Sequence, residues 1–169
     1  MNDALTKYYM WFRPTKLCRH YATAEPYHVF PDFLPFAESV KSKNITFAVI
    51  SNYDIRLHGI LEKLGLSHFF DKIITSEEAK VSKPSAEIFK LCQNQCGMNA
   101  AKPEEILHIG DDIEKDYHGA KNIKWNGLII KREQNHDNSL VSAPRYICNS
   151  FDEVYYVMQT PGLLLSRAF

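Results

Sequence analysis

The 169-residue sequence lacks a long apolar run, and the residues after Met1 contain no apolar segment of the kind that begins a secretory signal. A membrane-spanning helix needs about 18 or more consecutive apolar residues, and a signal peptide needs an apolar region after its charged start. We therefore expect neither a membrane span nor secretion. We expect an intracellular protein, and the cytoplasm is the simplest location.

The sequence also lacks an excess of charge of either sign. Lysine plus arginine and aspartate plus glutamate each number 20, so the formal net charge is zero. A balanced composition gives no electrostatic reason to expect nucleic acid or an anionic membrane as a partner. The length fits one domain with a sizeable core.

Cysteine is scarce and scattered, with four residues and no Cys-x-x-Cys pair. Nothing resembles a disulfide framework, which favours a reducing compartment. Cys92 and Cys96 lie four residues apart on an expected helix, where two thiols on one helix face are a simpler interpretation than a metal site.

Residues 1–44 differ from the rest, because they are rich in tyrosine, phenylalanine and histidine, contain four prolines and show only short helical stretches. From residue 45 onward, short apolar runs alternate with amphipathic segments. This spacing indicates βαβ units and a parallel sheet. The pattern predicts strands over 45–50, 72–75, 106–109, 127–130 and 145–148, and helices over 54–64, 84–96, after 116 and after 150.

Several residues mark where the expected elements begin and end. Asp54 precedes an apolar stripe that stops at Gly65, as an N-cap and a C-terminal glycine do. Ser150 and Glu153 have the spacing of a capping box at the start of the last helix. The run over 45–50 is typical of a strand that is buried on both faces.

Polar side chains follow the first two expected strands. Ser51 and Asn52 offer a hydroxyl, an amide and backbone N–H groups ahead of a helix, which suits a phosphate. Lys83 directly precedes Pro84, where an ammonium could neutralise phosphate oxygens and hold a carboxylate in place. The simpler alternatives are turn formers that cap the next helix for the first pair, and a solvated loop residue for the lysine.

Three carboxylates follow the strand over 106–109. Asp111 and Asp112 come after Gly110, and Asp116 lies one helical turn further along. Carboxylates this close repel one another unless a cation lies among them, and Mg²⁺ takes a few carboxylates together with water and phosphate oxygens. The alternative is that the aspartates cap a helix N-terminus. Because ligands bind beyond the carboxyl ends of the strands of an open parallel sheet, all these groups are candidates for one site.

The order of the three motifs is more specific than any one of them. Strand–Ser51-Asn52, Lys83-Pro before a helix, and strand–Gly-Asp111-Asp112-x-x-x-Asp116 resemble motifs two, three and four of the haloacid dehalogenase (HAD) superfamily. The resemblance implies a three-layer α/β fold with a Rossmann-like parallel sheet. It also implies two parts, a partial helical cap with its return segment over 1–44 and a core over 45–169.

The same resemblance implies a magnesium-dependent phosphatase-type hydrolase that acts on a small phosphorylated molecule. Ser51 and Asn52 would bind the phosphoryl group, and Lys83 would stabilise the charged intermediate. The implied metal residues are then the three aspartates: Asp111 would ligate Mg²⁺, Asp112 would ligate or flank it, and Asp116 would hold Lys83 or the water shell of the metal.

The sequence departs from the family in one respect, because no Asp-x-Asp occurs in it. Family members begin with a strand that ends in Asp-x-Asp, whose first aspartate is the nucleophile and whose second is the general acid and base. Asp3 and Asp32 belong to no such motif. The missing strand would lie centrally, between those that end at Ser51 and Gly110, so we expect two apolar strand edges without their shared partner.

Two hypotheses about function follow. The first is a truncated or variant HAD-like hydrolase with little or no activity of its own, because covalent catalysis needs its nucleophile. The second is a non-catalytic module that binds phosphate and magnesium, or a protein. A response-regulator receiver domain is set aside, because its acidic pair comes first and its lysine last, the reverse of the order here.

Overall fold

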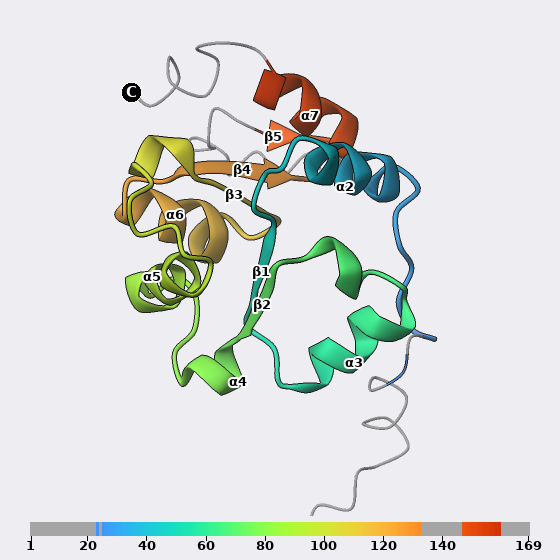
Figure 1. The fold of residues 1–169 in the computed structure, drawn as a ribbon, viewed down its shortest axis with the longest axis horizontal. Coiled ribbons are helices and arrows are strands. Elements are labelled where there is room, and N and C mark those ends of the chain that lie inside the picture. Colours follow the sequence, from blue (N-terminus) through green and yellow to red (C-terminus); the bar gives the residue numbers. More distant parts are fainter. Residues whose placement is uncertain (1–22, 24, 133–146, 160–169) are drawn as a thin grey trace, which may run out of the picture.

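The computed structural model describes residue 23, residues 25–132 and residues 147–159 (Figure 1). Most of the predicted partial cap, and the start of the strand predicted over 145–148, lie outside these residues. The described helices are α2 (Phe33–Ser42), α3 (Arg56–Lys63), α4 (Ser76–Ala79), α5 (Ala86–Gln95), α6 (Gly119–Asn122) and α7 (Phe151–Gln159). Single turns of 3₁₀ helix lie at η1 (Ser67–Phe69) and η2 (Pro103–Glu105), and η3 (Ile113–His118) is a π-helix.

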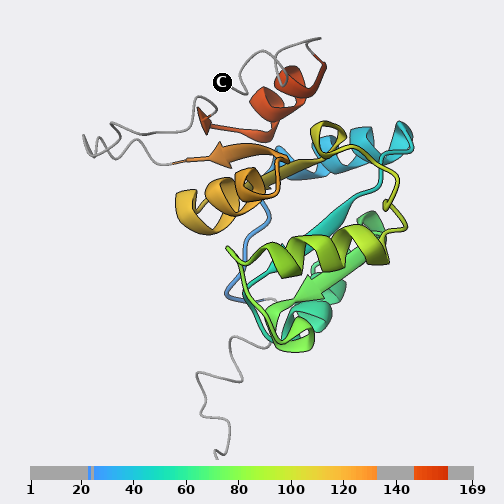
Figure 2. The same cartoon turned by 90° about the vertical axis from the view of Figure 1, so that its left-hand side faces the viewer.

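The strands form two parallel sheets. The first pairs β1 (Ala48–Ser51) with β2 (Lys72–Thr75), and the second has the order β3 (Leu107–Gly110), β4 (Asn126–Ile130), β5 (Ile147–Cys148). Figures 1 and 2 show β3, β4 and β5 with α2 and α7 in one half of the molecule, and β1 and β2 with α3 and α4 in the other. Parallel strands that alternate with helices confirm the predicted α/β class.

No strand in the described part of the chain pairs with the second edge of β1 or with the free edge of β3. Ile50 is buried, but Ala48 and Val49 are only half-buried, so the prediction that this strand is buried on both faces was wrong for these two residues. We attribute their exposure to the unpaired edge, since a neighbouring strand with its side chains would cover it.

The first strand also begins three residues later than predicted. The backbone N–H of Phe47 donates to Asp71 Oδ2 at 2.8 Å, and the Phe47 carbonyl accepts from the backbone N–H of Asp71 at 2.7 Å. Asp71 therefore forms hydrogen bonds with both backbone groups of Phe47, the residue before β1, through its side chain and its own backbone N–H. The prediction over Lys72–Thr75 matches β2 residue for residue.

The helix boundaries follow most of the capping signals. Gly65 after α3 has a φ of 71°, as a C-terminal glycine does. The N-cap of α3 is Ile55 and not Asp54, although Asp54 Oδ1 accepts from the backbone N–H of Arg56 at 3.0 Å. Ser150 Oγ accepts from the backbone N–H of Glu153 at 3.2 Å, while the Glu153 carboxylate accepts from the backbone N–H of Asn149. These are the hydrogen bonds of a capping box, with its return bond displaced by one residue.

Two clusters of buried apolar side chains form most of the core. In one, α5 packs on β1 and β2 and against α6 around Phe89, which is fully buried and meets Trp125 edge-on at 5.6 Å between ring centroids. Burial raises the pKa of Cys92 in this cluster to about 12, so the thiol stays protonated.

In the second cluster, α2 and α7 pack on the other sheet, where Phe36 and Val40 of α2 meet Leu128 of β4 and Val154 of α7. Helix α2 is therefore part of the core packing, and the domain division at residue 44 stays a prediction. None of the described helices is long and apolar enough to cross a membrane.

Candidate active site

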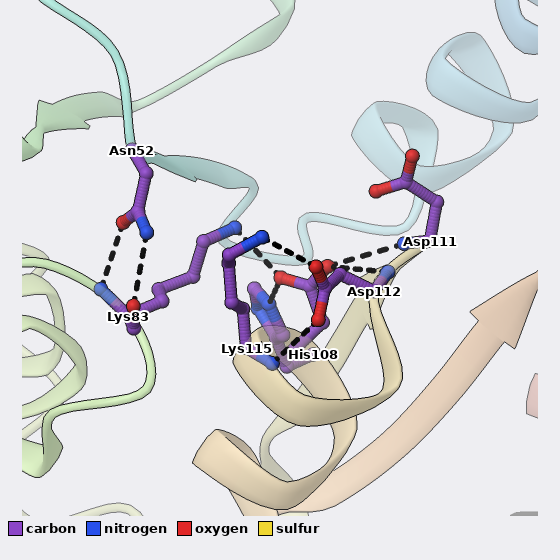
Figure 3. A network of polar contacts seen from close by, with 7 residues as sticks. Asn52, Lys83, His108, Asp111, Asp112 and Lys115 are labelled. Carbon is purple, nitrogen blue, oxygen red and sulfur yellow. Dashed lines mark hydrogen bonds and ion pairs between the residues drawn. The ribbon is translucent and has the colours of Figure 1, made fainter.

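Asp116 is the centre of a polar cluster at the carboxyl end of β3. Figure 3 labels Lys83, His108, Asp111 and Asp112, the residues that contact it. Its side chain is only 4% exposed. Oδ1 accepts from Lys83 Nζ at 2.7 Å and lies 2.9 Å from His108 Nε2. Oδ2 accepts from the backbone N–H groups of Asp111 at 3.2 Å and Asp112 at 3.0 Å. Four donors thus saturate the carboxylate, which the low dielectric of a buried site requires.

These contacts set the protonation states in the cluster. Burial alone would raise the pKa of Asp116, but the hydrogen bonds from His108 and Lys83 and the charge of Lys83 outweigh it and hold the pKa far below its ordinary range. The pKa of His108 is lowered, first by burial and then by the nearby ammonium of Lys83, although its contact with Asp116 opposes this. A neutral imidazole can still donate from Nε2 to the Asp116 carboxylate and does not repel the ammonium of Lys83, so a neutral His108 suits both neighbours.

The glycine before the acidic pair is explained by this packing. A Cβ placed on Gly110 would collide with the carboxyl group and the Cβ of Asp116. The side chain of Asp116 therefore occupies the space that a side chain at residue 110 would need, which is how its carboxylate reaches the backbone N–H groups that follow the strand.

We predict that Gly110→Ala destabilises the protein by about 2 kcal/mol, because the added methyl group forces the buried carboxylate out of its four hydrogen bonds. Equilibrium urea denaturation checks this value. Gly59→Ala is the matched control, because a Cβ there meets nothing within 4 Å. Equal effects of the two substitutions would contradict the packing argument.

Lys83 is held from two sides. Its side chain is 12% exposed, and its ammonium is bound to Asp116. Its backbone is bound by Asn52, whose Oδ1 accepts from Lys83 N–H at 2.7 Å and whose Nδ2 donates to the Lys83 carbonyl at 2.9 Å (Figure 3). Asn52 thereby joins the end of β1 to the loop before α5. Its amide positions Lys83. Ser51, half-buried at the end of β1, directly precedes Asn52 in the chain.

The two adjacent aspartates have different surroundings. Asp112 caps η3: its Oδ1 accepts from the backbone N–H of Lys115 at 2.8 Å and its Oδ2 from Lys115 Nζ at 2.5 Å. These hydrogen bonds lower the pKa of Asp112. Asp111 is exposed, and its carboxylate points away from the cluster in Figure 3, with no hydrogen-bond partner among the described residues.

A complete magnesium site is not assembled by these residues. Within the described ranges, no three His, Cys, Asp or Glu side chains are grouped so that they could hold a metal ion. The oxygens of Asp112 and Asp116 are bound by Lys115 and Lys83, so Asp111 is the carboxylate with free oxygens. Mg²⁺ is often bound by one or two carboxylates together with phosphate oxygens and water. The Asp111 carboxylate therefore suits one side of a magnesium site, whose other ligands would be phosphate oxygens and water.

Of the two roles predicted for Asp116, the geometry supports the one in which it holds Lys83. His108 and Lys115 also belong to the cluster, and neither was predicted as a site residue. A signal for His108 was present, because it stands between Leu107 and Ile109 in an apolar strand, and an imidazole that is buried there needs a polar partner.

Two other described aspartates, Asp32 and Asp54, are held outside the cluster. Asp32 accepts from Arg132 Nη2 at 2.9 Å and from the backbone N–H of Phe151 at 2.8 Å, which joins the start of α2 to the start of α7. Asp54 forms an ion pair with Arg56. Neither is hydrogen-bonded to the Lys83–Asp116 cluster.

The profile of the haloacid dehalogenase-like hydrolase family matches residues 2–124. "Haloacid dehalogenase-like hydrolase domain-containing protein 3" of Danio rerio is 33% identical over 138 residues, which are 82% of this chain and 56% of that protein. "Glyceraldehyde 3-phosphate phosphatase" of Methanothermobacter thermautotrophicus is 32% identical over 105 residues, 62% of this chain and 45% of that protein. The chain spans about half the length of these curated relatives.

Solved structures show the same fold. A HAD phosphatase from Thermococcus onnurineus matches with a TM-score of 0.73 at 22% identity, over 85% of this chain and 63% of the other. The putative HAD-hydrolase YfnB from Bacillus subtilis, whose structure has magnesium bound, matches with a TM-score of 0.67 at 18% identity, over 78% of this chain and 56% of the other.

Proposed function

The chain belongs to the haloacid dehalogenase-like hydrolase family, and we propose that it binds the phosphoryl group of a small molecule at the carboxyl ends of β1 and β3 but hydrolyses it little or not at all on its own. The observation that carries the proposal is the Lys83–Asp116 pair, which presents an ammonium at the end of the sheet. The limit on turnover rests on the absence of Asp-x-Asp from the sequence.

Lys83 is suited to bind a phosphoryl group. An ammonium has three donors, of which Asp116 takes one. Only 12% of the Lys83 side chain is exposed, so a bond from its ammonium to an anion competes with less water than a bond on the open surface. The hydroxyl of Ser51 at the end of β1 adds a neutral donor.

Asp111 would repel a phosphoryl group unless a cation lay between them. Mg²⁺ bound at this carboxylate would neutralise phosphate oxygens and polarise the phosphorus centre. We propose Asp111 as a magnesium ligand of this chain, with Asp112 flanking it as the cap of η3. Mg²⁺ should then tighten the binding of phosphate, because it removes the repulsion between Asp111 and the phosphoryl group. Phosphate should tighten the binding of Mg²⁺ in turn, because its negative charge attracts the cation.

The proposal predicts that Lys83→Gln weakens the binding of inorganic phosphate by about tenfold or more, because a charge-assisted hydrogen bond of about 1.5–3 kcal/mol is lost. Isothermal titration calorimetry with and without Mg²⁺ measures this. Lys115→Gln is the matched control, since Lys115 lies in the same cluster but is half exposed and pairs with Asp112.

Two further results belong to this experiment. Mg²⁺ should tighten the binding of phosphate to the wild-type chain, and Asp111→Asn should remove that gain. Thermal melting of each variant shows that it is folded under the titration conditions. Equal phosphate affinity in the wild type and in folded Lys83→Gln would refute the proposed site.

A further inference from the structure

A pocket of about 350 Å³ lies where the C-terminal ends of α2 and α7 meet, and these two helices are in contact. Its volume is within the range of ~300–1,000 Å³ that is typical of small-molecule pockets. It is lined by Val40, Lys43, Ile45, Tyr155, Met158 and Gln159. We propose that this pocket binds a small molecule with an apolar body and a single carboxylate, such as a medium-chain fatty acid. None of the lining residues belongs to the Lys83–Asp116 cluster, so this site is independent of the proposed phosphate site.

Three side chains form the apolar part of the lining. Val40 is buried between α2 and α7, Met158 is half-buried, and Ile45 is 41% exposed. The backbone N–H of Ile45 donates to the Val40 carbonyl at 3.5 Å, which keeps these two residues together after the end of α2. The flexible thioether of Met158 can follow the shape of a ligand. Each methylene group of a ligand that leaves water against these side chains favours binding, so this part of the pocket selects for apolar area.

The polar part of the lining presents hydrogen-bond donors. The Lys43 ammonium lies over the ring of Tyr155, 4.6 Å from its centroid. Hydrogen bonds with Ser39 and Lys43 lower the pKa of Tyr155, so its hydroxyl group lies beside the ammonium. A phenol that accepts such bonds still has its own O–H to donate, and the Gln159 amide has two N–H donors. None of the described residues that line the pocket carries a carboxylate, so an anionic group meets donors without a competing acid.

The charge of Lys43 decides which sign of ligand charge is favoured. A helix carries partial negative charge at its C-terminal end, which by itself disfavours an anion. In α2 these carbonyl groups are already bonded: that of Val40 accepts from the backbone N–H groups of Lys43 and Ile45, and that of Lys41 accepts from Asn44. The ammonium carries a full charge and can form a charge-assisted hydrogen bond with a carboxylate. One ammonium balances one carboxylate, whereas an amine on the ligand would face Lys43.

NMR titration of the 169-residue chain with three eight-carbon probes, octanoate, 1-octanol and octylamine, measures affinity and locates the bound probe. We expect octanoate to bind about tenfold more tightly than octanol, because a charge-assisted hydrogen bond is added. Octylamine should bind more weakly than octanol. Hexanoate should bind about tenfold more weakly than octanoate, because two fewer methylene groups leave water. The largest changes in backbone amide shift should lie at the lining residues.

Two variants test the two parts of the lining. Lys43→Gln should weaken octanoate about fivefold to tenfold and leave octanol unchanged. Ile45→Gln should weaken both probes, because it removes apolar area, and Ile45 is exposed enough for the substitution to leave the core intact. Lys63→Gln is the matched control for Lys43→Gln. Lys63 is an exposed lysine in the last turn of α3 that does not line the pocket, so this variant should bind all probes as the wild type does.

Four results would overturn the proposed carboxylate site. Octanoate that binds no more tightly than octanol removes the role of the ammonium, and equal effects of Lys43→Gln and Lys63→Gln remove its position. Loss of octanoate binding in Lys83→Gln would move the carboxylate to the phosphate site. A dimer in analytical ultracentrifugation that Ile45→Gln dissociates would show that a second copy of the chain covers the pocket. Inorganic phosphate is titrated separately, so the phosphate site and the carboxylate site can each fail alone.

Discussion

Asp116→Asn is expected to lower the free energy of unfolding by about 3–5 kcal/mol, the largest cost of any single polar substitution at the site. The side chain of Asp116 is 4% exposed, and its carboxylate accepts from four donors, one of which is the ammonium of Lys83, whose side chain is 12% exposed. An amide keeps the shape of the side chain but leaves this cation without its counter-charge. Urea denaturation at pH 7 measures the difference from the wild type.

Asp112→Asn is the matched control for this prediction. Asp112 has the same charge and lies four residues away, but its side chain is 35% exposed and its role is to cap η3. Loss of this cap should cost about 1 kcal/mol. Similar costs for the two substitutions would contradict the central role of Asp116 in the cluster.

The stabilisation by Asp116 should depend on pH in one direction. Despite burial, which raises it, the pKa of this carboxyl is held below its ordinary value of 3.8 by His108 and Lys83. A group with a depressed pKa stabilises the fold above its unfolded pKa and loses that contribution as the pH falls through the folded one. The difference between wild type and Asp116→Asn should therefore shrink below about pH 4. A difference that grows on acidification would reverse the sign and contradict the assignment.

Addition of an upstream segment that forms one apolar strand ending in Asp-x-Asp is expected to stabilise the fold by about 3 kcal/mol. One edge of β1 and one edge of β3 have no partner among the described strands, and Val49, Leu107 and Ile109 of these strands are only half-buried. Covering each of these three side chains should contribute about 1 kcal/mol, half the value of full burial. Solubility should rise too, because unpaired strand edges promote aggregation.

A control segment of equal length, with a proline at the centre of the strand, should give no gain, because proline cannot complete the pairing. Thermal melting and urea denaturation of the two extended chains measure the effect. Equal stability of both extended chains and of the original chain would show that the two sheets need no shared strand for their stability.

The elements and the motif order could be predicted from the sequence because they depend on local patterns. The strand over Lys72–Thr75 is a short β-branched run, and the helix over Ala86–Gln95 follows a proline and carries apolar residues at helical spacing. Lys83 and Asp116 were placed at one site because the carboxyl ends of parallel strands meet at one edge of a sheet.

The details that the sequence did not predict depend on which of several possible partners a side chain takes. Asn52 was expected to bind a phosphoryl group, and its amide is bound to the backbone of a residue 31 positions later in the chain. Asp112 was expected to ligate Mg²⁺ or to flank it, and its oxygens are bound by Lys115 through a local cap that competes for the same lone pairs. Neither outcome can be read from residue types and spacing, because one carboxylate or amide suits both roles.

Hydrolysis of p-nitrophenyl phosphate with Mg²⁺, by the 169-residue chain and by the chain extended with an Asp-x-Asp strand, tests the central claim most directly. We predict no turnover by the 169-residue chain above that of its Asp111→Ala variant. The extended chain should hydrolyse the ester and lose this activity when the first aspartate of the added motif becomes asparagine. Magnesium-dependent turnover by the 169-residue chain that disappears in Asp111→Ala would contradict the claim that the nucleophile is missing.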